Sequence, residues 1–325
     1  MRTEKCPNSV LIVSLVALAL ASICALLLGA TSISLGDAYA SSDARMVILT
    51  LRLPRVLFAI LVGGALALVG AAYQTLFRNP LASPFTLGVS SGAALGASLS
   101  LMATTSVFGI TSSAMLGALV SIFVILLISR RMGSAAGDSL LLVGIVFSFF
   151  CSSILTMLQY MSDYSQLFRV TRWMMGGIPA VQLSDLTIGV ILVVMLFVWL
   201  ARTYREFDLM LFGDEVATVK GVSVRKLYYG TFVLSSFVVG WIVSQCGVIG
   251  FVGIVVPAVA RLLVGLRHKY VVPLSFVLGA LLVVLCDLLG RVVRPPFEVP
   301  AGVFTAVLGG PIFIALAITS YRRFN

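Results

Sequence analysis

Charged residues are scarce in this chain, and histidine is almost absent. Of the 325 residues, 10% are charged, 60% are hydrophobic and one is a histidine, whereas soluble globular proteins carry roughly a quarter charged residues. This composition excludes a soluble globular protein and indicates an all-α, polytopic membrane protein. We expect it to form a single membrane domain over residues 1–325.

The sequence also lacks the motifs of metal sites, nucleotide sites and hydrolytic enzymes. Its five cysteines form no CxxC or Cys/His cluster, and most lie in apolar runs, as small buried hydrophobic residues do. There is no HExxH motif, no cluster of His, Asp and Glu, and no Walker motif. We therefore expect no metal and no cofactor bound by this chain, no covalent chemistry, and no ATP hydrolysis except on a separate chain.

What the chain has in quantity is apolar stretches of roughly the 17–25 residues that cross a bilayer as a helix. They lie near residues 10–30, 53–73, 85–105, 107–129, 139–160, 185–201, 228–246, 248–266, 271–289 and 301–320. This pattern predicts about ten transmembrane helices, although two closely spaced pairs leave room for a merged or broken helix. The first stretch is too long for a signal peptide, so we expect it to be retained.

Lysine and arginine indicate the orientation, because short loops rich in them stay in the cytoplasm. With the N-terminus inside, seven of the 22 Lys and Arg residues fall outside and the other 15 fall inside. The outer seven are Arg45, Arg52, Arg55, Arg169, Arg172, Arg291 and Arg294. We expect both termini in the cytoplasm, and this asymmetry explains the net charge of +10 without nucleic-acid binding.

The longest polar interval, residues 202–227, divides the chain into two hydrophobic halves and is expected in the cytoplasm. Asp214 is placed to be the N-cap of a short helix with Glu215 in its first turn, and Gly221 to be the left-handed residue after that helix. Ser223 is the expected N-cap of the next helix. A compact helix in such a loop indicates a surface for a partner, with an ordinary connector as the alternative.

The outer arginines are exceptions to the positive-inside pattern. Arg52 and Arg55 share a helix face, and Arg291 and Arg294 precede the PPFEVP connector. If these two ends meet, they form a basic patch that binds carboxylates of a partner. The alternative is that each arginine reaches lipid phosphates. Asp287 lies four residues before Arg291 and is placed to pair with it.

Small and polar residues mark three further stretches. Glycines at every fourth position from residue 88 to 96 predict close approach of another helix. The glycines of residues 247–253 with Pro257 predict a broken or re-entrant element. The fifth apolar segment carries candidate residues for a translocation path, although such hydroxyls commonly bond to their own helix. The path candidates are Ser148, Ser152, Thr156 and Gln159. The one histidine, His268, is expected to be a solvated residue of a cytoplasmic turn.

Five motifs, taken together and in order, resemble the FecCD-type (BtuC-like) permease family, the membrane subunits of ABC importers for ferric siderophores, haem and vitamin B12. They are LRLPRVLFAILVGGALALVGAAYQTLFRNPLASPFTLGVSSGA, WMMGG, FGDEVATVKGV, GVIGFVGIVVPAVARLLVG and EVPAGVFTAVLGGPIF. The resemblance implies a type II ABC importer permease fold with ten helices. It also implies a second permease subunit, two cytoplasmic ATPases that bind ATP and Mg, and an extracytoplasmic substrate-binding protein.

The resemblance also implies roles for particular residues. The loop near residues 203–227 would contact the ATPase through Gly213, Asp214, Glu215, Val216, Ala217 and Gly221. Arg52, Arg55 and Arg291 would receive acidic residues of the binding protein. The family commonly has VPH where this chain has Val256, Pro257 and Ala258, so no role is carried over to a histidine there.

The expected function is therefore import of a ferric siderophore or similar metal chelate across the bacterial inner membrane, with vitamin B12 or haem as alternative cargo. The permease dimer is either a homodimer or a heterodimer. An ion-coupled secondary transporter is the alternative of a different class, but it would be expected to keep ionisable residues near the midplane. The predicted segments are nearly free of them.

Overall fold

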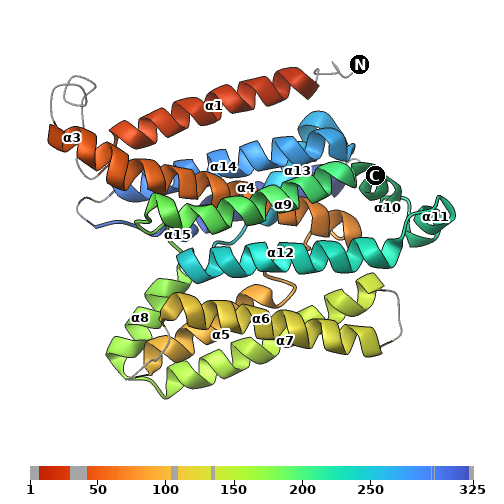
Figure 1. Ribbon diagram of the computed structural model, residues 1–325, viewed down its shortest axis with the longest axis horizontal. Helices are drawn as coiled ribbons and strands as arrows, with labels where there is room; N and C mark the ends of the chain where they lie inside the picture. Colours follow the sequence, from red (N-terminus) through yellow and green to blue (C-terminus); the bar gives the residue numbers. More distant parts are fainter. Residues whose placement is uncertain are drawn as a thin grey trace. The chain divides into compact units, whose positions relative to one another are not determined.

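The computed structural model describes residues 7–29, 42–103, 109–132, 136–293, 295 and 297–321. Regular structure within these residues is entirely helical, which confirms the all-α class (Figure 1). The elements are α1 (Pro7–Leu27), α3 (Ser42–Val47), η1 (Ile48–Arg52), α4 (Leu53–Leu76), α5 (Val89–Met102), α6 (Ile110–Arg131), α7 (Ala136–Tyr160), α8 (Tyr164–Met174), η2 (Leu183–Asp185), α9 (Leu186–Arg202), α10 (Tyr204–Met210), α11 (Asp214–Val219), α12 (Val224–Cys246), α13 (Val252–Val264), α14 (His268–Val292) and α15 (Ala301–Tyr321).

Each of the ten predicted apolar segments coincides with one helix, namely α1, α4, α5, α6, α7, α9, α12, α13, α14 or α15. Among the described residues, six helices are long and apolar enough to cross a membrane. The pair α9 and α10, bent by 64°, is a seventh candidate, and three shorter apolar helices complete the ten. These three are Val89–Met102, Val252–Val264 and Ala301–Leu316.

The chain forms two compact units, each assembled from segments that are not continuous in sequence. Unit 1 contains Met1–Ala71, Gly177–Ile191 and Ile249–Asn325. Within it, α14 packs against α1, α13 and α15. A Cβ atom at Gly63 of α4 would overlap the carbonyl of Gly279 in α14, so these two backbones pass in direct contact, as small residues allow in membrane helices.

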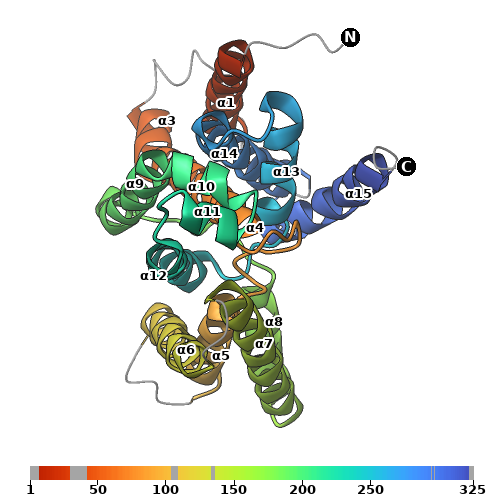
Figure 2. The ribbon, with the colours of Figure 1, turned by 90° about the vertical axis from the view of Figure 1, so that its right-hand side faces the viewer.

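Unit 2 contains Ala72–Gly176 and Leu192–Val248. Within it, α5 packs closely against α6, while α12 lies against α5 and α6 (Figure 2). The predicted close approach at the glycines of residues 88–96 is confirmed at two of them. A Cβ atom at Gly92 would overlap the side chain of Ser121, and one at Gly96 would overlap the carbonyl of Ser113, both on α6.

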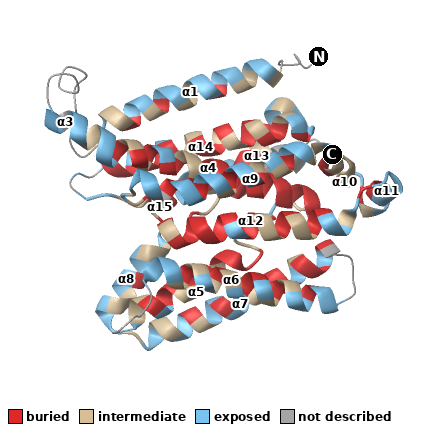
Figure 3. Ribbon diagram, in the orientation of Figure 1, coloured by how far each residue is buried: buried red, intermediate tan, exposed pale blue. Residues whose placement is uncertain are grey.

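Burial differs sharply between helices. Most of α12 is buried, whereas α1 buries only Ser14, Ala21 and Ala25 (Figure 3). The exposed apolar side chains of α1 fit a lipid environment, because hydrocarbon imposes no cost on apolar surface.

The polar interval 202–227 contains α10 and α11, and one predicted cap is wrong. Gly213, not Asp214, is the N-cap of α11, and Asp214 is its first residue. Gly213 has φ +109°, a conformation that L side chains rarely adopt, so glycine occupies the cap and leaves the carboxylate of Asp214 to bind neighbouring residues. Gly221, with φ +87°, is left-handed as predicted. Ser223 is the N-cap residue of α12, without a side-chain cap bond.

Two predictions for the second half of the chain, the broken element after α12 and the solvated His268, have different outcomes. Residues 247–251 interrupt the helices between α12 and α13, in agreement with a broken element, and a re-entrant path stays a prediction. The prediction of a solvated His268 is wrong, because this residue is only 1% exposed. α14 begins at His268 itself, three residues before the predicted apolar run, so this residue belongs to a buried helix end and not to an exposed turn.

Candidate functional site

The short helix α11 is closed at its C-terminus by two backbone hydrogen bonds. The N–H of Gly221 donates to the carbonyl of Thr218 and the N–H of Val222 donates to that of Ala217, each at 2.9 Å. This is the Schellman arrangement, which uses a left-handed glycine to satisfy carbonyls that have no partner within the helix. These bonds fix the C-terminal end of α11, a helix of about two turns that is too short to be stable alone.

One side of α11 is packed and the other is open. Ala217 is fully buried, while the apolar side chains of Phe212, Val216 and Val219 are 74%, 43% and 86% exposed. Glu215 is exposed as well. Exposed apolar side chains gathered on a polar loop are typical of an interaction surface. The predicted coupling residues therefore divide into an anchor at Ala217 and a presented face.

The side chain of Asp214 connects the start of α11 to the turn after α4, which is also in unit 2. Its carboxylate lies 3.4 Å from the guanidinium of Arg78, in the turn after α4. The same guanidinium lies against Gly213, where a Cβ atom would be 3.2 Å from it. The orientation of α11 is therefore set by contacts from Arg78, in the turn after α4, as well as by its own caps.

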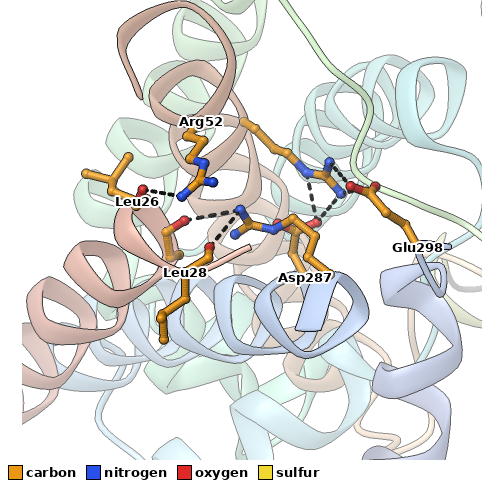
Figure 4. A network of polar contacts seen from close by, with 8 residues as sticks. Leu26, Leu28, Arg52, Asp287 and Glu298 are labelled. Atoms are coloured by element: carbon orange, nitrogen blue, oxygen red, sulfur yellow. Dashed lines mark hydrogen bonds and ion pairs between the residues drawn. The ribbon is translucent and has the colours of Figure 1, made fainter. Parts of the chain in front are cut away.

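A second site lies in unit 1, where η1, α4 and α14 bring together the three predicted docking arginines Arg52, Arg55 and Arg291 (Figure 4). Arg55 donates from Nε and from one terminal nitrogen to Oδ1 of Asp287, at 3.1 and 2.9 Å. Its terminal nitrogens also donate to both oxygens of Glu298, at 3.1 and 2.9 Å. Arg291 pairs with the other oxygen of Asp287 at 3.1 Å, as its i, i+4 spacing predicts.

Two members of this arginine cluster, Arg52 and Arg291, also contact the end of α1. Arg52 donates to the carbonyls of Leu26 and Leu27 at 2.9 and 2.8 Å. Arg291 donates to the carbonyls of Ala25 and Leu28 at 3.1 and 3.4 Å. The last carbonyls of a helix have no partner within it and carry partial negative charge, so two guanidinium groups are suited to cap them.

The predicted meeting of the outer arginines is confirmed for Arg52, Arg55 and Arg291, but the three are not an open basic patch in this conformation. Arg52 is 7% exposed and Arg291 is 4% exposed, while the side chain of Arg55 is 16% exposed. Arg294 lies outside the described residues. The sequence interpretation missed Glu298, although its place in the connector directly after Arg291 and Arg294 could have suggested an ion pair.

The predicted path residues lie along α7. Ser152 and Thr156 are exposed, and Ser148 and Gln159 are partly buried. The hydroxyl of Ser148 donates to the carbonyl of Gly144 and that of Thr156 to the carbonyl of Ser152, at 2.9 Å each. These are bonds to the preceding turn, the alternative considered for this segment. A role in a translocation path stays a prediction.

No group of three or more His, Cys, Asp or Glu residues that could hold a metal ion occurs in the described part of the chain. The cysteines described there, Cys24, Cys151, Cys246 and Cys286, are free thiols.

Comparison with known proteins shows clear relatives. Residues 16–319 match the FecCD transport family. The chain is 38% identical to the hemin transport system permease protein HmuU of Yersinia pestis, over 90% of each chain. It is 34% identical to the Fe(3+) dicitrate transport system permease protein FecD of Escherichia coli, over 87% of this chain and 89% of that one.

A solved structure resembles the chain as a whole. It is an inward-facing conformation of a transporter assigned to the metal-chelate type of ABC transporter, with a TM-score of 0.87 and 29% identity over 96% of this chain and 99% of that one. The family match and these similarities each cover most of the chain. The chain belongs to the FecCD transport family.

Proposed function

We propose that this chain is the permease subunit of an ABC importer that moves a ferric siderophore or similar metal chelate across the bacterial inner membrane. Two cytoplasmic ATPases, a second permease chain that is identical or homologous, and an extracytoplasmic binding protein complete the importer. Membership of the FecCD family and the similarity to iron and hemin permeases support this assignment.

The observation that carries the proposal is the presented face of α11. A membrane chain without a Walker motif has no energy source of its own. This chain nevertheless holds a short helix by both ends, and it exposes Val216 and Val219 on that helix and Phe212 in the turn just before it. A short helix that is held at both ends and exposes apolar side chains is suited to bind in a groove on a soluble partner. ATP binding and hydrolysis on that partner then favour one of two permease conformations through different contacts with each.

On the outer face, the arginine cluster is the proposed docking site for acidic residues of the binding protein. Arg55 is its most accessible guanidinium, and it already holds Asp287 and Glu298. The side chain of Glu298 is 44% exposed and that of Asp287 is 3% exposed. An incoming carboxylate therefore reaches Arg55 by replacing Glu298, while Asp287 stays in place.

The cargo is proposed from the family, with haem and vitamin B12 as alternatives. Similarity to a hemin permease favours haem. Against direct haem ligation by this chain, the one histidine, His268, is buried at the start of α14. The weakly polar side chains along α7 are better suited to the passage of a bulky chelate through many weak contacts.

The test is reconstitution in liposomes with candidate ATPase and binding-protein chains, measuring uptake of radiolabelled ferric siderophore, haem and cobalamin in parallel. Val219→Asp changes the exposed side of α11, Phe212→Asp changes the exposed turn just before it, and Met132→Asp is the control. Met132 is 44% exposed in the turn after α6, which is also predicted to be cytoplasmic.

We expect ATP-dependent uptake of one ligand, lost in both α11 variants and kept in the control. A loss of about 1–2 kcal/mol of binding per variant corresponds to a roughly five- to thirtyfold weaker association with the ATPase. Uptake driven by an ion gradient without the ATPase would contradict the proposal and restore the secondary transporter.

A further inference from the structure

A single hydroxyl group in unit 2 joins three helices at the base of the coupling loop. Tyr228, in the second turn of α12, is 2% exposed. Its hydroxyl donates to the carbonyl of Leu76 at 2.5 Å, and Oδ1 of Asp214 lies 3.5 Å from the same oxygen. A tyrosine hydroxyl has one proton to donate. The carbonyl of α4 and the carboxylate of α11 are therefore alternative acceptors for that proton.

The acceptor on α4 belongs to the last residue of that helix. Carbonyls in the last turn of a helix have no partner within it, so Tyr228 caps α4. The turn that follows is sharp, because Arg78 is left-handed with φ +46°. From there the guanidinium of Arg78 reaches Asp214. The end of α4 and the start of α11 are thus connected twice, through the ion pair and through the tyrosine.

The surroundings of the hydroxyl are tightly packed. A Cβ atom at Gly137, near the start of α7, would lie 2.5 Å from the oxygen of Tyr228. The ring of Phe77 packs against that of Tyr228 with centroids 5.9 Å apart. A displacement of α11 therefore cannot be absorbed by free space around this side chain, because no gap separates it from α4 or α7.

We propose that Tyr228 is a positioning residue that transmits movement of α11 to the end of α4 by exchanging its hydrogen bond between Leu76 and Asp214. The inference rests on the proposed function, in which α11 is moved by a partner ATPase. In the present conformation the bond goes to Leu76. A shift of α11 that brings Asp214 closer transfers the bond to the carboxylate and releases the last carbonyl of α4. Two discrete bonding arrangements are what a coupling element requires.

Tyr228→Phe tests the hydroxyl alone, since it keeps the ring and its packing. Tyr73→Phe is a matched control, because Tyr73 is also fully buried in unit 2 and its hydroxyl is bonded to the side chain of Ser235, away from α11. Asp214→Asn is a second test, because it weakens the alternative acceptor and the ion pair without changing the size of the side chain.

The measurement is the number of substrate molecules imported per ATP hydrolysed by the reconstituted complex, together with thermal stability. A hydrogen bond worth about 0.5–1.5 kcal/mol predicts a fall of about two- to tenfold in this ratio for Tyr228→Phe. Asp214→Asn is expected to lower the ratio as well, and Tyr73→Phe to leave it unchanged. ATP hydrolysis should persist in Tyr228→Phe and Tyr73→Phe, so the defect of Tyr228→Phe is uncoupling and not loss of assembly.

The outcomes separate this inference from the proposed function. A normal ratio in Tyr228→Phe, or an equal fall in Tyr73→Phe, would overturn the role of the tyrosine while leaving an ATP-driven permease in place. Absence of ATP-driven uptake in the wild-type complex would overturn the proposed function and this inference with it.

Discussion

At the scale of single residues, Arg55 holds two carboxylates of very different accessibility. Asp287 is almost completely buried and touches a second guanidinium, that of Arg291, whereas Glu298 is nearly half exposed. Water screens an exposed ion pair and leaves it worth little, but removal of one partner from a buried pair strands an uncompensated charge. The two acids therefore differ in role: Asp287 holds the cluster together and Glu298 occupies a replaceable position.

This difference predicts unequal losses of stability. Asp287→Asn should lower the free energy of unfolding by about 3–5 kcal/mol, because Arg55 and Arg291 both lose their buried partner. Glu298→Gln should cost less than about 1 kcal/mol. Both substitutions preserve side-chain size, so neither creates a cavity. Thermal unfolding of the purified protein in detergent measures the two effects, and equal shifts would show that burial does not distinguish these acids.

Part of the arginine cluster could be predicted from the sequence and part could not. The pairing of Asp287 with Arg291 follows from their spacing on one helix. The bonds from Arg52 to the end of α1 do not, because backbone carbonyls are present at every residue and only the folded structure shows which of them lack partners. Of the predicted basic patch, Arg52, Arg55 and Arg291 are bonded to groups within the chain in this structure.

At the scale of helices, the seam between α5 and α6 shows how small residues determine packing. Gly92 and Gly96 of α5 contact Gly117 and neighbouring residues of α6 so closely that a Cβ atom would overlap them. In a bilayer, helices associate through such close packing because apolar burial between them gains nothing over lipid. The four-residue spacing was sufficient to predict a close contact, but the identity of the partner helix required the structure.

A pair of glycine substitutions tests this seam. Gly96→Ala should destabilise the protein by about 1–3 kcal/mol through overpacking against the carbonyl of Ser113. Gly310→Ala is the control: Gly310 lies within α15, and no atom comes within 4 Å of a Cβ placed there. There the higher helix propensity of alanine, worth about 1 kcal/mol, should leave stability unchanged or raised. Thermal unfolding in detergent measures the stability of both variants. Destabilisation by Gly310→Ala alone would contradict the assignment of the seam.

Helix ends were less predictable than helix existence. Asp214 has the chemistry of an N-cap, yet Gly213 takes that place because the backbone there needs a φ of +109°. Asp214 then makes tertiary contacts with Arg78 and Tyr228 instead. His268 was misassigned for a related reason, since α14 begins before its apolar run.

At the scale of the whole molecule, the ten helices follow from hydrophobic length, but the two compact units do not. Unit 1 joins residues 1–71 to residues 177–191 and 249–325, and unit 2 joins residues 72–176 to residues 192–248, yet no composition change marks where one segment stops and the next begins. The bias of Lys and Arg nevertheless predicts the orientation of the chain. That orientation is what the proposed function depends on, because α11 can meet a cytoplasmic ATPase only if its loop lies inside.

Labelling of engineered cysteines tests the orientation directly. Val219 in α11 and Tyr164 at the start of α8 are 86% and 85% exposed, so accessibility is matched. Each is changed to cysteine in a background with Cys6→Ser and Cys24→Ser, and a membrane-impermeant maleimide is applied to vesicles of both orientations. We expect Val219→Cys to react only in inside-out vesicles and Tyr164→Cys only in right-side-out ones, because 15 of 22 Lys and Arg residues then lie in the cytoplasm.

The reverse pattern would place α11 outside the cell, where no ATPase could contact it, and the arginine cluster inside. It would therefore remove both proposed docking sites at once, whereas the expected pattern leaves each facing the partner that its chemistry suits.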